Sequence, residues 1–225
     1  MNWQILQTNT YKTMKTIYLT GFIAFILMAC GNTQTPTEVY HSRNETKEET
    51  QTNQIKEELK PMEYVVIETN KGDITLELDP NKAPVTVANF LSYVDAGHYD
   101  NTVFHRVISN FMIQGGGFTA DGTQKPTQSP IELESQNGLS NDVGTIAMAR
   151  TNAPNSATAQ FFINVAQNDF LNYKPGNPGY AVFGKVSSGM DVVNEIRQVE
   201  TRSYMGQQDW PVEAVTIKTI RKEEK

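Results

Sequence analysis

The sequence predicts an all-β-dominated domain, built as a closed antiparallel β-barrel that is capped by two α-helices. From residue 61 onward, many short β-rich runs are separated by turn residues, and two segments show helical periodicity. An antiparallel sheet of many short strands avoids exposed edges by closing on itself. The strand-rich pattern and the two helical segments together therefore predict a capped barrel.

The predicted domain opens with a β-hairpin. Residues 64–68 and 74–78 are β-rich, and residues 70–73, Asn-Lys-Gly-Asp, supply a turn between them. Leu76 and Leu78 alternate with Glu77, so one face of the second strand is predicted to be buried. Further strands are predicted at residues 102–108, 111–114, 145–149, 161–165, 181–186 and 215–218.

Helical periodicity appears in residues 83–94 and 190–199. Pro84 suits the first position of a helix, and Gly97 suits its C-terminal end. In each segment the apolar residues fall on one face: Val87, Phe90, Leu91 and Val94 in the first, and Val192, Val193 and Ile196 in the second.

Composition excludes several functional classes. The 225 residues carry a formal net charge of −6 and no basic cluster, which gives no electrostatic reason to expect nucleic-acid binding. Cys30 is the single cysteine, so an intrachain disulfide and a thiolate metal cluster are both impossible. The three histidines, His41, His98 and His105, lack metal-ligand spacing on a helix. We expect no metal site.

The N-terminal segment has the pattern of a secretory signal. Residues 17–29 are apolar, follow two lysines and are too short for a comfortable membrane span. Residues 27–30, Leu-Met-Ala-Cys, resemble a bacterial lipobox, which implies cleavage before Cys30 and attachment of lipid, including palmitate-type acyl chains, to that residue. An uncleaved signal anchor, or a buried helix with an incidental thiol, is the alternative. A start at Met14 would give a signal of the usual compact shape.

The sequence therefore divides into three parts. Residues 1–29 are predicted to be a lipoprotein signal peptide, and residues 30–60 a lipid-anchored flexible tether. The tether has few large apolar residues and so cannot bury enough surface to offset its chain entropy. Residues 61–225 are predicted to form the folded domain.

Two segments concentrate chemically informative residues. Residues 104–118 read FHRVISNFMIQGGGF, and residues 148–164 run from Met-Ala-Arg to Gln-Phe-Phe-Ile-Asn. On strands, Arg106 and Ile108 would share one face, and Met112 and Gln114 another. This pattern presents a cation, a thioether and an amide beside aromatic rings. It contains no nucleophile paired with a base, and its glycine cluster lacks the Lys-Ser/Thr of a phosphate loop.

These segments resemble the cyclophilin family of peptidyl-prolyl cis-trans isomerases. Residues 104–106 with 111–116 are similar to the central signature of the family, and residues 160–163 and 182–186 to its two later blocks. Residues 149–151 and 178–180 look like the bacterial branch. The resemblance implies an eight-stranded barrel with a filled interior and two helices, and a substrate groove on its outer face.

The resemblance also implies residue roles. Arg106 matches the catalytic arginine, and Gln114 matches the residue that holds the substrate backbone. Either Arg150 or Thr151 would supply a backbone contact in the groove. Phe170 matches a position that holds tryptophan in cyclosporin-sensitive members. The remaining substrate-binding matches are the proline pocket, Phe111, Met112, Phe162 and Leu171, and two groove-lining residues, His105 and Tyr180.

The implied function is rotation about X–Pro bonds, which assists the folding of exported proteins and needs no cofactor. Its partners would be proline-containing polypeptides and, through Cys30, a bacterial membrane on its extracytoplasmic side; we expect a monomer. The alternative is a surface module that binds proline peptides without required turnover. Taken singly, Met112 and Phe162 could be core residues, Arg106 a surface ion-pair partner and Gln114 an ordinary strand residue.

Overall fold

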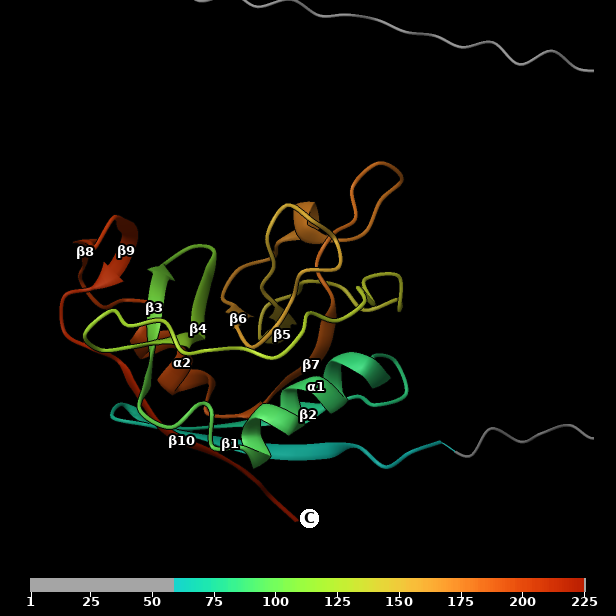
Figure 1. Ribbon diagram of the computed structural model, residues 1–225, viewed down its shortest axis with the longest axis horizontal. Helices are drawn as coiled ribbons and strands as arrows, with labels where there is room; N and C mark the ends of the chain where they lie inside the picture. Colours follow the sequence, from blue (N-terminus) through green and yellow to red (C-terminus); the bar gives the residue numbers. More distant parts are fainter. Residues whose placement is uncertain (1–58, 225) are drawn as a thin grey trace, which may run out of the picture. The chain divides into compact units, whose positions relative to one another are not determined.

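The computed structural model describes residues 59–224, which form a closed antiparallel barrel (Figure 1). Eight strands close it in the order β1-β10-β3-β4-β6-β5-β7-β2, and a separate two-stranded sheet joins β8 to β9. Every neighbouring pair in the barrel is antiparallel. The prediction of an eight-stranded barrel with two helices is therefore confirmed.

The longest connections between the elements are residues 120–144 between β4 and β5, residues 149–160 between β5 and β6, and residues 165–181 between β6 and β7. The strands are β1 (Glu63–Thr69), β2 (Gly72–Leu78), β3 (Thr102–Ile108), β4 (Met112–Thr119), β5 (Thr145–Met148), β6 (Phe161–Asn164), β7 (Val182–Ser188), β8 (Thr201–Tyr204), β9 (Gln207–Pro211) and β10 (Thr216–Lys222). The helices are α1 (Pro84–Asp95), α2 (Met190–Ile196) and the short 3-10 helix η1 (Asp169–Leu171).

Several observed boundaries differ from the predicted ones. Strand β4 continues to Thr119, through the three glycines at residues 115–117. Helix α2 ends at Ile196, three residues earlier than predicted. The β8–β9 hairpin was not predicted at all. Figure 1 shows it beside the end of the β3–β4 pair.

Alternating side chains fill the barrel interior. On β6, Phe161 and Ile163 belong to the main core, whereas Phe162 belongs to a second, smaller cluster. Helix α1 closes the core through Phe90, whose ring centroid lies 5.6 Å from that of Phe161 and 5.3 Å from that of Phe183. The buried aromatic packing gives the strands a rigid base for the side chains on their outer face.

The predicted signal peptide, the Cys30 lipidation site and nearly all of the predicted tether lie outside the described residues. Lys60, at the end of that tether, exchanges two backbone hydrogen bonds with the side chain of Asn81. In residues 59–224, no helix is long and apolar enough to cross a membrane.

Candidate active site

The candidate site is a row of side chains that crosses four neighbouring strands. Arg106 on β3 is opposite Gln114 on β4, Gln114 is opposite Phe162 on β6, and Phe162 is opposite Ala147 on β5. Residues opposite one another in a sheet point to the same face. The pairing therefore brings a guanidinium, an amide and an aromatic ring together on the outside of the barrel.

A β-bulge in β3 determines which side chains join this row. Phe104 is opposite Gly115 and Arg106 is opposite Gln114, so β3 holds one extra residue at this point. Phe104 and Val107 pack into the barrel core, although they are three residues apart. The bulge thus allows the adjacent side chains of His105 and Arg106 both to line the outer groove.

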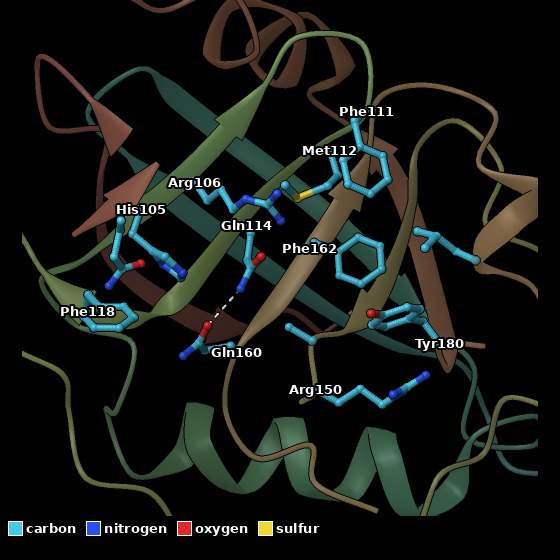
Figure 2. A pocket seen from close by; sticks show the side chains of 13 residues that line it. His105, Arg106, Phe111, Met112, Gln114, Phe118, Arg150, Gln160, Phe162 and Tyr180 are labelled. Carbon is cyan, nitrogen blue, oxygen red and sulfur yellow. Dashed lines mark hydrogen bonds between the residues drawn. The ribbon is translucent and has the colours of Figure 1, made fainter. Parts of the chain in front are cut away.

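The side chains surround a groove of about 390 Å³ (Figure 2). Eight of the residues singled out in the sequence line it: His105, Arg106, Phe111, Met112, Gln114, Phe162, Leu171 and Tyr180. Phe170 does not line it. That side chain is 60% exposed and stacks on Phe111, with ring centroids 5.5 Å apart, so it extends the apolar surface at the rim.

The apolar end of the groove is a compact pocket. Met112, Phe162 and Leu171 are buried there with Ala147 and Val182, and the ring of Tyr180 meets that of Phe162 edge to face at 5.6 Å. Met112 and Phe162 are thus buried, but in a cluster outside the barrel rather than in its main core. In Figure 2, the side chains of Arg106, Phe111 and Met112 converge on one space.

Buried asparagines hold the walls of this pocket together. The side-chain amide of Asn168 donates to the carbonyl oxygen of Phe111 at 2.9 Å and to Oδ1 of Asn164 at 2.7 Å. The backbone N–H of Leu171 donates to the carbonyl oxygen of Asn168 at 2.9 Å. Because these groups are buried and mutually satisfied, they fix the loop before β4, the end of β6 and η1 relative to one another.

A hydrogen bond fixes the orientation of Gln114. Its Nε2 donates to Oε1 of Gln160 at 2.9 Å, as Figure 2 shows, which leaves Oε1 of Gln114 as an acceptor facing the groove. Gly117 makes room for this pair, because a Cβ at residue 117 would lie 2.6 Å from the Gln160 side chain. Gly116 has a φ of +83°, and a Cβ there would lie 2.8 Å from Tyr99. The glycine cluster thus serves close packing.

Arg150 is a structural partner of Tyr180. Its Nε and Nη2 donate to the carbonyl oxygen of Gly179 at 2.9 and 2.6 Å, and its guanidinium carbon lies 4.4 Å from the centre of the Tyr180 ring. Arg150 lines the groove. Thr151 is exposed and bonds Ser156 instead. Arg150 therefore lies at the groove, whereas the choice between Arg150 and Thr151 for the backbone contact to a substrate stays a prediction.

His105 is a neutral side chain in this setting. Its residue is 2% exposed, and burial lowers the pKa of the imidazole from 6.5 to about 4, helped by the positive charge of Arg106. The Val103 carbonyl and the Gln160 side chain oppose this shift, although the buried Nδ1 makes no hydrogen bond of normal geometry. With such a pKa, His105 is not a proton donor near neutral pH.

Sequence reasoning missed one wall of the groove. Gln207, on the β8–β9 hairpin, lines it beside His105 and Phe118. The available signal was the turn residue Gly206, which lies between Tyr204 and Trp210, two residues of types that are enriched in strands. Among residues 59–224, no cluster of three or more His, Cys, Asp or Glu side chains is arranged to hold a metal ion.

Comparison with known proteins agrees with this geometry. Residues 64–222 match the family described as cyclophilin type peptidyl-prolyl cis-trans isomerase/CLD. Peptidyl-prolyl cis-trans isomerase cyp18 of Streptomyces antibioticus is 58% identical over 163 residues, which cover 71% of this chain and 98% of the relative. Peptidyl-prolyl cis-trans isomerase B of Escherichia coli K12 is 54% identical over 159 residues, 69% of this chain and 97% of the relative.

A solved structure has the same fold. The crystal structure of a cyclophilin-type peptidyl-prolyl cis-trans isomerase from Cryptosporidium parvum superposes with a TM-score of 0.62 and 28% sequence identity. The superposition covers 73% of this chain and 99% of that one. A second crystal structure of that protein, in the presence of the dipeptide Ala-Pro, gives a TM-score of 0.60 at 29% identity.

Proposed function

The chain belongs to the cyclophilin-type family of peptidyl-prolyl cis-trans isomerases, and from this premise we propose that it isomerises X–Pro bonds of exported polypeptides, with Arg106 as its catalytic residue. The isomerase class follows from the family and from the bacterial relatives. The residue roles and the exported clients are the proposal. The observation that carries it is the placement of the Arg106 guanidinium beside a buried apolar pocket.

The proposed chemistry follows from the nature of the amide bond. An X–Pro bond resists rotation because the nitrogen lone pair is conjugated with the carbonyl, which gives a barrier of about 18–20 kcal/mol. Rotation breaks this conjugation and turns the nitrogen into a hydrogen-bond acceptor. A guanidinium beside the proline ring donates to that nitrogen in the twisted state and not in the planar ground state. Arg106 would therefore stabilise the transition state selectively.

The other groove residues would bind and orient the substrate. The pocket of Phe111, Met112, Phe162 and Leu171 is apolar, as a pyrrolidine ring requires. The free Oε1 of Gln114 would accept a substrate N–H, because Gln160 holds the other end of the amide. No bond in the substrate is made or broken, so the proposed mechanism uses only these side chains.

Replacement of the guanidinium tests the catalytic role. We expect Arg106→Ala to lower kcat/KM by about 100-fold or more in a protease-coupled proline-peptide assay, equivalent to ~2.7 kcal/mol of transition-state stabilisation, with the fold retained by circular dichroism. The control is Arg221→Ala, which removes an exposed guanidinium that pairs with Glu68 on β1. Unchanged turnover in Arg106→Ala would refute the role. Wild-type protein that binds the peptide without turnover would favour the binding-module alternative.

We further propose that the protein works outside the cytoplasm, attached to a bacterial membrane by lipid on Cys30. The support is the apolar segment at residues 17–29 that ends in a lipobox-like sequence. Slow prolyl isomerisation limits folding after export as it does elsewhere, so an anchored isomerase would act where exported chains fold. Several acyl chains give stable anchoring where a single chain binds only reversibly.

The anchor is tested by cell fractionation and mass spectrometry. We expect Cys30→Ser to release the protein from the membrane fraction, while Thr33→Ala, a control three residues away, leaves it attached. The mature wild-type N-terminus should be an acylated Cys30. An unmodified Cys30 in membrane-bound protein would disprove the lipid anchor without affecting the isomerase proposal.

A further inference from the structure

The β8–β9 hairpin is fixed against the groove by aromatic packing. Trp210 on β9 is 3% exposed, and its ring lies 5.9 Å from those of both His105 and Phe118 and 5.2 Å from that of Tyr204. Gln207, at the start of β9, reaches the groove itself. The hairpin is therefore a rigid wall on the Arg106 side, across the groove from the Tyr180 side.

The β8–β9 hairpin also places a carboxylate, that of Asp209, beside Arg106. Oδ2 of Asp209 lies 3.7 Å from Nε of Arg106, with side chains 37% and 42% exposed. Within residues 59–224 this is the one ion pair that Arg106 makes. The contact is at the Nε edge of the guanidinium, so the two terminal nitrogens stay available to the groove. Figure 2 shows the Arg106 side chain directed toward Met112.

The backbone at Asp209 has an unusual conformation. Its φ is +61°, in the left-handed region that glycine adopts freely and other residues adopt at a cost. Aspartate tolerates this region better than most residues do, but it is still less favourable than glycine there. A residue with a strained backbone, in contact with a side chain that is proposed to act in catalysis, is a reason to look for a functional role.

We propose that Asp209 is a positioning residue, which restrains the Nε edge of Arg106 so that the terminal guanidinium nitrogens face the proline pocket. The inference rests on the catalytic role proposed for Arg106. A long arginine side chain loses rotamer freedom when it is held in one geometry, and the carboxylate supplies that restraint before substrate arrives. The restraint acts on the transition-state contact, so it should affect kcat rather than KM.

Two substitutions separate this role from a structural one. Asp209→Gly removes the carboxylate and the backbone strain together, whereas Asp209→Asn removes the charge and keeps the shape. We expect both to lower kcat by about two- to five-fold with little change in KM, equivalent to ~0.4–1 kcal/mol, the range of an exposed ion pair. The Tm of Asp209→Gly should stay at or above the wild-type value. A merely structural role would lower Tm and leave the kcat of the folded protein unchanged.

Salt dependence and a charge-matched control complete the test. At about 1 M salt the ion pair is screened, so the difference in kcat between wild type and Asp209→Asn should shrink. Glu213→Gln makes the same change in net charge at an exposed residue outside the groove, and it should keep wild-type kcat. Wild-type kcat in both Asp209 variants would overturn the inference. If Arg106→Ala also kept wild-type activity, the catalytic proposal itself would fail. If Arg106→Ala lost activity while both Asp209 variants kept it, only the proposed role of Asp209 would fail.

Discussion

Lowering the pH from 7 to 4 is expected to remove about 3 kcal/mol of folding stability through one side chain, His105. Burial lowers its pKa from 6.5 to about 4, a difference of ~2.5 units at ~1.4 kcal/mol each. Between these values the unfolded chain binds a proton that the folded protein excludes, so acid favours unfolding. The stability is fully present above about pH 6.5 and is lost as the pH falls to 4.

Urea unfolding of wild type and His105→Gln at several pH values measures this effect. The variant lacks the ring packing against Phe118, so it should be less stable at pH 7. The stability advantage of the wild type should then shrink by about 3 kcal/mol between pH 7 and 4. His98→Gln is the control, because the His98 ring is only partly buried and its pKa is lowered less. A constant wild-type advantage over this range, or an NMR titration of His105 near 6.5, would refute the reasoning.

Two further predictions concern the groove. Gly117→Ala should lower kcat/KM by several-fold, because the new Cβ would lie 2.6 Å from the Gln160 side chain and would displace this hydrogen-bond partner of Gln114. A steady-state assay checks this expectation, and wild-type kinetics with an intact fold would contradict it. Cyclosporin should inhibit the wild type poorly and Phe170→Trp about ten-fold more tightly or better, because the indole adds an N–H donor and contact area beside Phe111. Equal, tight inhibition of both proteins in a drug titration would show that Phe170 does not control the contact.

Local sequence patterns predicted the parts of the fold that depend on near neighbours. Helix α1 begins at Pro84 as predicted, and Val87, Phe90 and Val94 on its apolar face are buried. Strand β3 has the predicted limits, residues 102–108. Such elements can be predicted because apolar residues recur every 3.6 residues on the buried face of a helix and every 2 residues on the buried face of a strand. The prediction failed for β8 and β9, in which only Trp210 and Pro211 are buried and which lack regular alternation.

The sequence by itself determined the barrel, its capping helices and most residues of the groove, because family-like motifs and apolar periodicities are local properties of the chain. Only the tertiary structure decided how those residues meet. A bulge in β3 turns His105 and Arg106 toward the same groove, which strand alternation alone does not allow. Packing of the β8–β9 hairpin against β3 brings Asp209, about a hundred residues further along, to 3.7 Å from Arg106. Contacts between residues so far apart produce no periodic pattern in the sequence, because they depend on strand register and on the packing of distant elements rather than on neighbouring residues.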